Sequence, residues 1–113
     1  MGVFHYEAVS VEFEDVLLTH LQIAIVQQFR HQRSFPMSWL DALNDGNGRS
    51  SLWLAPTVPF YFKFAGSRVP EIDVDWVKRL TESAMSSAGL IVMDRTGRPV
   101  RATRSARNWG TRI

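Results

Sequence analysis

Residues 49–66, with the sequence RSSLWLAPTVPFYFKFAG, restrict the possible folds of this chain more than any other stretch. Apolar residues recur there at every second position, on both sides of a segment with two prolines: Leu52, Leu54, Phe60, Phe62 and Phe64. Such alternation sends side chains to opposite faces of a β-strand, so each run predicts a strand with one apolar face. Proline cannot donate a ladder hydrogen bond, and the segment 56–59 is therefore predicted to be the turn between two paired strands. We expect this hairpin to supply a large share of the core.

The rest of the chain predicts four more strands and two helices. Alternation or a short apolar run marks the strands, at residues 3–6, 9–13, 34–43 and 90–93, and helical spacing of apolar residues marks the helices, at 16–31 and 73–87. The order β-β-α-β-β-β-α-β predicts a two-layer α+β domain, with a mostly antiparallel sheet of about six strands and two helices on one face. The third, fourth and fifth strands are expected to pair consecutively. We predict one domain over residues 1–93, since a chain of 113 residues ordinarily forms one domain.

Several residues of types that often act in catalysis or ligand binding are expected to have structural roles here. His20 lies among the apolar positions of the first helix, where a histidine is more often a satisfied, partly buried side chain than a ligand. Asp73 stands where the second helix begins, and a carboxylate there caps the helix. Three tryptophans lie on apolar periods or between apolar neighbours and are expected in the core: Trp39, Trp53 and Trp76.

The residues of a catalytic or metal site do not stand out in the sequence. There is no cysteine, which excludes disulfides, thiolate catalysis and cysteine-bound zinc. The histidines, His5, His20 and His31, do not have the spacing of a metal site, and no known nucleophile motif is present. We therefore expect no catalytic residue, no metal and no small-molecule cofactor, and we predict that the protein is not an enzyme.

A glycine-rich loop leads into the strand that begins near residue 49. Gly46, Gly48, Arg49 and Ser50 could in principle hold an anion with backbone N–H groups, a guanidinium and a hydroxyl. Known phosphate loops lead into a helix whose N-terminus helps to bind the anion, whereas this loop leads into a strand. We favour a plain turn between strands, with anion binding as the alternative.

The C-terminal residues 94–113 differ from the rest of the chain in charge. They contain six arginines and one acidic residue, Asp94, for a net charge of +5, while the other 93 residues have a net charge of −3. Five of these arginines recur at intervals of three: Arg95, Arg98, Arg101, Arg104 and Arg107, with Arg112 further on. In an extended, polyproline-like chain this spacing aligns the guanidinium groups along one edge, which suits the backbone of a polyanion. Few large apolar residues follow Met93, so we predict a flexible basic tail.

No segment of the sequence predicts export or membrane insertion. The longest apolar stretch, residues 21–26, is far shorter than a membrane span. The N-terminus lacks the charged and apolar regions of a secretory signal. We expect a cytoplasmic protein without membrane contact.

Short motifs along residues 1–93 carry a resemblance to a known family. They include Leu18-x-His20-Leu21, Ser34-Phe35, Ser38-Trp39, Gly48-Arg49-Ser50, Leu52-Trp53-Leu54-x-Pro56, Phe62-Lys63-Phe64-x-Gly66-Ser67-Arg68-x-Pro70, Trp76 and Gly89-Leu90. The chain resembles a small family of short actinobacterial proteins whose function is unknown. Similar sequences often carry the label ATP-dependent DNA ligase, which implies a lysine nucleophile that attacks ATP.

The residues of this chain do not support ligase activity. Such ligases use the lysine of a Lys-x-Asp-Gly motif, because a positioned amine must become a covalent nucleophile. Lys63 and Lys78 are the two lysines of the chain, and neither begins that motif. The nearest likeness is Asp45-Gly46, but Leu43 occupies the position that the lysine needs.

The sequence is compatible with two functions. In the first, the protein is a non-enzymatic binding module that associates with DNA or RNA through the arginines of the tail. In the second, it is a protein–protein or self-association module that forms a homo-oligomer and has no nucleic-acid role. The second rests on the aromatic content of the predicted hairpin and on open strand edges expected at Pro36 and at the last strand.

Overall fold

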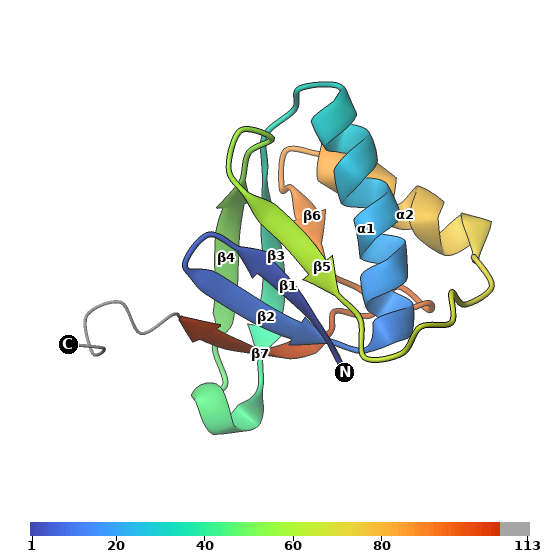
Figure 1. The fold of residues 1–113 in the computed structure, drawn as a ribbon. Helices are drawn as coiled ribbons and strands as arrows, with labels where there is room; N and C mark the ends of the chain where they lie inside the picture. The colour runs from blue at the N-terminus through green and yellow to red at the C-terminus, as the bar shows by residue number, and fades with distance from the viewer. Residues whose placement is uncertain (107–113) are drawn as a thin grey trace.

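The computed structural model describes residues 1–106, which form one open sheet of seven strands with two helices on it (Figure 1). The strands are β1 (Gly2–Tyr6), β2 (Val9–Phe13), β3 (Phe35–Asp41), β4 (Arg49–Leu54), β5 (Phe60–Lys63), β6 (Leu90–Ile91) and β7 (Arg101–Ala106). The helices are α1 (Asp15–Arg30) and α2 (Val74–Met85), and a short 3-10 helix, η1, spans Leu43–Asp45. Both helices lie on the same face of the sheet (Figure 1). The predicted α+β class, with a mostly antiparallel sheet, is confirmed.

The strand order is β4-β3-β7-β2-β1-β5, and β6 pairs with β3 beside β7. β3 runs parallel to β6 and β7, and the other strand pairs in the described part are antiparallel. β7 joins the two halves of the sheet, because its first residues pair with β3 and the rest pair with β2. In Figure 1, β3 and β4 run vertically while β1, β2 and β5 cross them obliquely, so the sheet is strongly twisted.

Strand β7 corrects the prediction that the chain is a flexible tail from residue 94 onward. Residues 101–106 lie in the middle of the sheet, between β3 and β2. Ala102, 5% exposed, is a buried apolar side chain in a strand that has no large apolar residue, so hydrophobic alternation does not reveal the strand. Residues 107–113 lie outside the described part of the chain, and the predictions for Arg107 and Arg112 lie there with them.

The predicted hairpin of residues 49–66 is also wrong. β4 pairs with β3 and β5 pairs with β1, so the two strands lie at opposite ends of the strand order. Residues 55–59 cross from one half of the sheet to the other. The Ala55 N–H donates to the Tyr6 hydroxyl at 2.8 Å, and the Glu7 N–H donates to the Pro59 carbonyl at 3.2 Å. Alternation predicted which face each strand buries, but it did not specify the neighbouring strand.

The core lies between the sheet and the two helices. The predicted apolar stripe of α1 is buried: Leu17, Leu18, Leu21, Ile25 and Phe29. Trp39 and Trp76 are buried as predicted, at 2% and 4% exposure. Trp53 is 60% exposed, so its predicted place in the core is wrong. Leu52 and Leu54 alternate with Trp53 and turn toward the core, which leaves the indole on the outer face.

Two aspartates connect the helices to the rest of the fold. Asp73 caps α2, as predicted, because its carboxylate accepts the Trp76 N–H at 3.2 Å. Asp15, the first residue of α1, accepts the N–H groups of Gly66 at 2.9 Å and of Ala65 at 3.0 Å. These two bonds, with Gly66 the stronger influence, hold the pKa of Asp15 below its ordinary value. The chain that follows β5 is thereby fixed to the start of α1.

Candidate functional site

A cleft of about 580 Å³ opens where the starts of α1 and β7 meet Trp76 of α2. Its walls are mostly apolar and include Phe13, Val16, Leu17, Trp76, Val100 and Ala102. Charged residues also line it: Glu12, Glu14, Asp94, Arg95 and Arg101. A concave apolar surface with a few polar groups is the usual form of a small-molecule site, so the roles of its polar neighbours decide what it could do.

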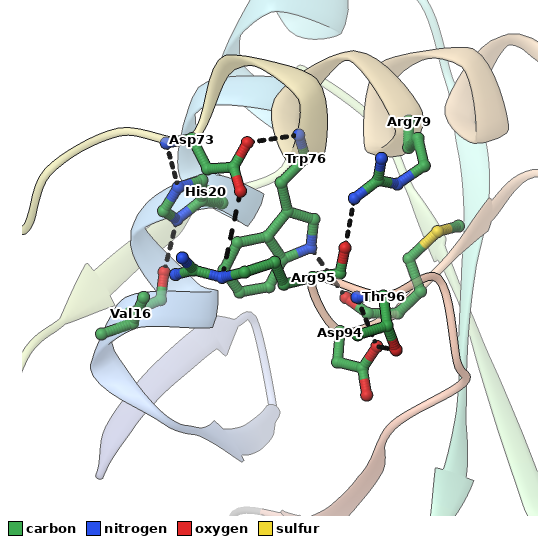
Figure 2. Close-up of polar contacts among 9 residues, drawn as sticks. Val16, His20, Asp73, Trp76, Arg79, Asp94, Arg95 and Thr96 are labelled. Carbon is green, nitrogen blue, oxygen red and sulfur yellow. Dashed lines mark hydrogen bonds and ion pairs between the residues drawn. The ribbon is translucent and has the colours of Figure 1, made fainter.

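His20 lies fully buried behind the cleft, stacked on Trp76 with ring centroids 4.3 Å apart (Figure 2). Its Nε2 accepts the Asp73 N–H at 2.9 Å, and its Nδ1 lies 2.7 Å from the Val16 carbonyl oxygen. Because Nε2 accepts a hydrogen bond, Nδ1 carries the proton and donates it to Val16, which defines a neutral ring. Both ring nitrogens are engaged, so the prediction of a satisfied, buried histidine is confirmed. His20 ties the start of α2 to α1.

Arg95 lies across the outer side of the same cluster (Figure 2). Its guanidinium is 5.2 Å from the centroid of the Trp76 ring, and its Nε is 3.9 Å from a carboxylate oxygen of Asp73. Its carbonyl oxygen accepts a hydrogen bond from the Arg79 guanidinium. Arg95 therefore fastens the segment after β6 to α2 by a cation–π contact and an ion pair.

Asp94 organises the tight turn that follows β6. Its Oδ1 accepts the hydroxyl of Thr96 at 2.7 Å and the N–H groups of Thr96 and Arg98 at 2.9 and 3.0 Å. The Thr96 hydroxyl, followed by the Arg98 N–H, holds the pKa of Asp94 below its ordinary value. This carboxylate on the cleft wall thus serves the local turn.

The arginines predicted to bind a polyanion do not form one row among the described residues. Arg95 is bound to α2, whereas Arg101 donates to the Asp41 carbonyl at 2.8 Å and to the Asn47 side chain at 3.2 Å. Arg98 and Arg104 are exposed. Arg101 and Arg104 belong to one strand, where a spacing of three places side chains on opposite faces. The alignment expected from the sequence requires a polyproline-like backbone, and the backbone here is a β-strand.

The glycine-rich loop forms a turn stabilised by the chain's own carboxylate. Gly46 ends η1 with φ of +107°, and the Ser50 hydroxyl donates to Asp41 Oδ1 at 2.7 Å. A Cβ at Gly48 would lie 3.3 Å from the other oxygen of Asp41. Arg49 is exposed in β4. Two groups predicted to hold an anion, Gly48 and Ser50, therefore already face a negative charge.

Within residues 1–106, β4 presents a backbone edge that pairs with no further strand. The Asp41 N–H donates to the Gly48 carbonyl at 2.9 Å, and hydrogen-bonded pairs alternate along an antiparallel ladder. The even-numbered residues of β4 therefore turn their backbone groups toward β3. Arg49, Ser51 and Trp53 turn theirs away from the sheet, and β4 ends the strand order. We call these three residues the β4 edge.

The surroundings of the β4 edge include exposed apolar side chains among polar ones. Trp53 lines a shallow cleft of about 560 Å³ together with Pro36 and Met85, and Met85 is 58% exposed. The open edge predicted at Pro36 is wrong, since β3 is paired on both sides. β6 was predicted to be the last strand, but β7 follows it; β6 has two residues and pairs with β3 on one side. The alternation in the sequence placed Trp53 on the opposite face from Leu52 and Leu54, but it gave no sign that β4 ends the strand order.

Within the described part of the chain, neither a metal-binding group of side chains nor a membrane-spanning helix is found. No group of three acidic or histidine side chains within residues 1–106 is placed to hold a metal ion. None of the helices found there is long and apolar enough to cross a membrane.

These features define a small α+β domain built on a single twisted, open sheet. The chain belongs to the family described as Domain of unknown function (DUF7882), whose model matches residues 1–95. No curated protein and no solved structure matches the chain. The resemblance to a family of unknown function is thus confirmed, and the match ends before β7. The strand that joins the two halves of the sheet lies outside the matched residues.

Proposed function

We propose that this chain is a non-enzymatic association module that binds a second copy of itself through the β4 edge. The observation that supports this most directly is the row of outward-facing N–H and C=O groups at Arg49, Ser51 and Trp53, on a regular strand of six residues. An exposed strand edge is a template on which another strand can pair.

The composition of β4 supports the same proposal. Proteins protect solvent-facing edges with lysine, proline, bulges or very short strands. β4 has no lysine, proline or bulge and pairs with β3 over six consecutive positions, and its one charged side chain is Arg49 at its first position. β5, the opposite end of the strand order, has four residues. β4 is therefore the longer of the two edges, and the exposed Trp53 adds apolar surface beside it.

The non-enzymatic character is supported by the polar groups around the larger cleft, because they already form hydrogen bonds or ion pairs within the fold. His20 and Asp73 hold the helices together, and Arg95 is paired with Asp73. A general base must be able to reach a substrate proton, and the His20 ring is buried with both nitrogens bonded.

The test is self-association of the wild-type chain and of two Ser51 variants. Ser51→Pro removes an N–H that points away from the sheet, so it blocks the edge without breaking a bond to β3. Ser51→Ala is the control, because both substitutions lose the hydroxyl bond between Ser38 and Ser51, at 3.1 Å. Sedimentation velocity over a hundredfold dilution is the measurement.

We expect the wild type and Ser51→Ala to sediment faster as concentration rises, and Ser51→Pro to remain monomeric. Thermal unfolding of the proline variant should stay close to that of the alanine variant, which shows that the fold is kept. A wild type that is monomeric at every concentration would overturn the proposal. Equal association of the proline variant and the wild type would overturn the role of the β4 edge.

A second candidate function is non-specific binding of DNA or RNA, and the observation that favours it is the exposure of Arg98 and Arg104. Removing residues 94–113 is not a usable test, because it deletes β7. The double variant Arg98→Gln/Arg104→Gln is matched by Arg30→Gln/Arg68→Gln, which removes two exposed arginines elsewhere. Fluorescence anisotropy with labelled DNA and RNA measures the affinity as salt is varied.

If nucleic acid binds at this end of the chain, the first double variant binds more weakly and the control does not. The salt slope on duplex DNA should become shallower by roughly 0.9 for every phosphate that the variant no longer neutralises. Equal affinity of the two double variants would contradict a specific contribution of Arg98 and Arg104.

A further inference from the structure

We infer that the self-association proposed above is a two-fold antiparallel pairing of β4 with β4, centred on Ser51, in which Arg49 and Trp53 determine the register. The inference rests on the proposed function and adds the geometry of the interface. Three constraints lead to it: the pleat of the strand, the backbone groups that are already bonded, and the side chains on the outer face.

The pleat limits the registers that two copies can adopt. When a sheet continues across an antiparallel interface, residues opposite one another lie on the same face. A shift of one residue would place outward side chains opposite inward ones. The residues of β4 whose backbone groups point outward are odd-numbered, so each must pair with an odd-numbered residue of the partner. The two-fold axis then passes through a residue position and not between two residues. The possible centres are Ser50, Ser51 and Leu52.

The neighbouring backbone excludes two of these centres. A centre at Leu52 would set Arg49 opposite the partner's Ala55, whose N–H already donates to the Tyr6 hydroxyl at 2.8 Å. A centre at Ser50 would set Trp53 opposite the partner's Asn47, which has φ of +58° and cannot continue a strand. A centre at Ser51 sets Arg49 opposite the partner's Trp53 and uses only residues of the β4 edge.

The side chains complement one another in this register. Arg49 and Trp53 are both exposed on the outer face, and directly opposed Cβ atoms lie about 4.5–5.5 Å apart. Arg49 of each copy can then lie over the partner's Trp53, a cation–π contact made twice by symmetry. The chain makes the same kind of contact internally, with Arg95 at 5.2 Å from the Trp76 ring. Small Ser51 side chains meet at the axis.

A charge exchange tests the register. Trp53→Lys places the introduced lysine opposite the partner's Arg49, and like charges directly opposite one another are unfavourable. Adding Arg49→Glu to this variant converts the same two contacts into attractive pairs. The control is Arg68→Glu with Trp53→Lys, which has the same net charge but changes an exposed arginine outside β4. Sedimentation equilibrium gives the dimer Kd of each protein.

We expect Trp53→Lys to raise the dimer Kd by at least about tenfold, and Arg49→Glu/Trp53→Lys to return it to within about threefold of the wild type. The Arg68→Glu control should remain as weak as Trp53→Lys alone. A dimeric wild type without rescue by Arg49→Glu overturns the register and leaves the proposed function standing. A wild type that is monomeric throughout overturns both. Circular dichroism confirms that these exposed substitutions preserve the fold.

Discussion

Ending the chain after Arg95, where the family match stops, should abolish the native fold. The shortened chain lacks β7, which pairs with residues 9–12 of β2 and with Leu40 and Asp41 of β3. Two strands that are interior in the native sheet would then face each other without a strand between them. The core would also be without the buried Ala102.

The magnitude follows from the hydrogen bonds of β7. An antiparallel ladder makes roughly one backbone bond per residue pair, so the pairing with β2 contributes about four. The Leu40 N–H to Val100 and Ala42 N–H to Ala102 bonds, both 3.0 Å, join the same segment to the β3 side. At about 1 kcal/mol for each bond, the loss is about 6 kcal/mol. A domain of this size is stabilised by only about 5–15 kcal/mol in total.

Urea unfolding followed by circular dichroism and tryptophan fluorescence measures the effect. Residues 1–106 should unfold cooperatively, whereas residues 1–95 should show no cooperative transition. A cooperative 1–95 chain whose unfolding free energy is within about 1 kcal/mol of the 1–106 chain would refute the central role of β7.

Three further variants test individual contacts. Gly89→Ala should destabilise the fold more than Gly97→Ala, as measured by the urea midpoints of the two variants. Both glycines have positive φ, but only at Gly89 would an added Cβ lie 2.4 Å from Pro36. His20→Leu leaves the Asp73 N–H without its acceptor and should cost about 1–3 kcal/mol in urea unfolding, so an unchanged midpoint would contradict the tie between the helices. Asp15 has a lowered pKa, so its contribution to stability is complete above its ordinary pKa of 3.8 and is lost as the pH falls below it. The stability difference between wild type and Asp15→Asn should therefore shrink between about pH 6 and about pH 3, and a constant difference would argue against the bonds to Ala65 and Gly66.

The elements of this fold were more predictable from the sequence than their arrangement. Alternation from Phe60 to Phe64 correctly predicted a strand, because the period of two is a local property of the backbone. Its neighbour could not be predicted in this way, since Phe62 packs on Phe4, far away in the chain, with ring centroids 5.0 Å apart. β7 escaped prediction because apolar alternation is weak in a strand so rich in arginine and small residues.

In the candidate site too, local features were predictable from the sequence and tertiary contacts were not. The burial of His20 and the hydrogen bonding of its ring were predicted from its neighbours on the helix. Its acceptance of the Asp73 N–H, from a residue 53 positions away, depends on tertiary structure. Trp53 was misplaced because an indole is large and apolar enough for the core, although the leucines beside it had already taken the inward positions. Which strand ends a sheet depends on strand order, and no local pattern specifies that order.

The position of β7 also has a consequence for biosynthesis. A ribosome makes the chain from the N-terminus, so β2 and β3 emerge before the strand that separates them. Until the last described residues are released, the nascent polypeptide carries exposed strand borders that the finished protein lacks, and such borders attract other chains. Completion of the sheet therefore waits until β7 has been synthesised, and a pause in synthesis before that point would favour aggregation.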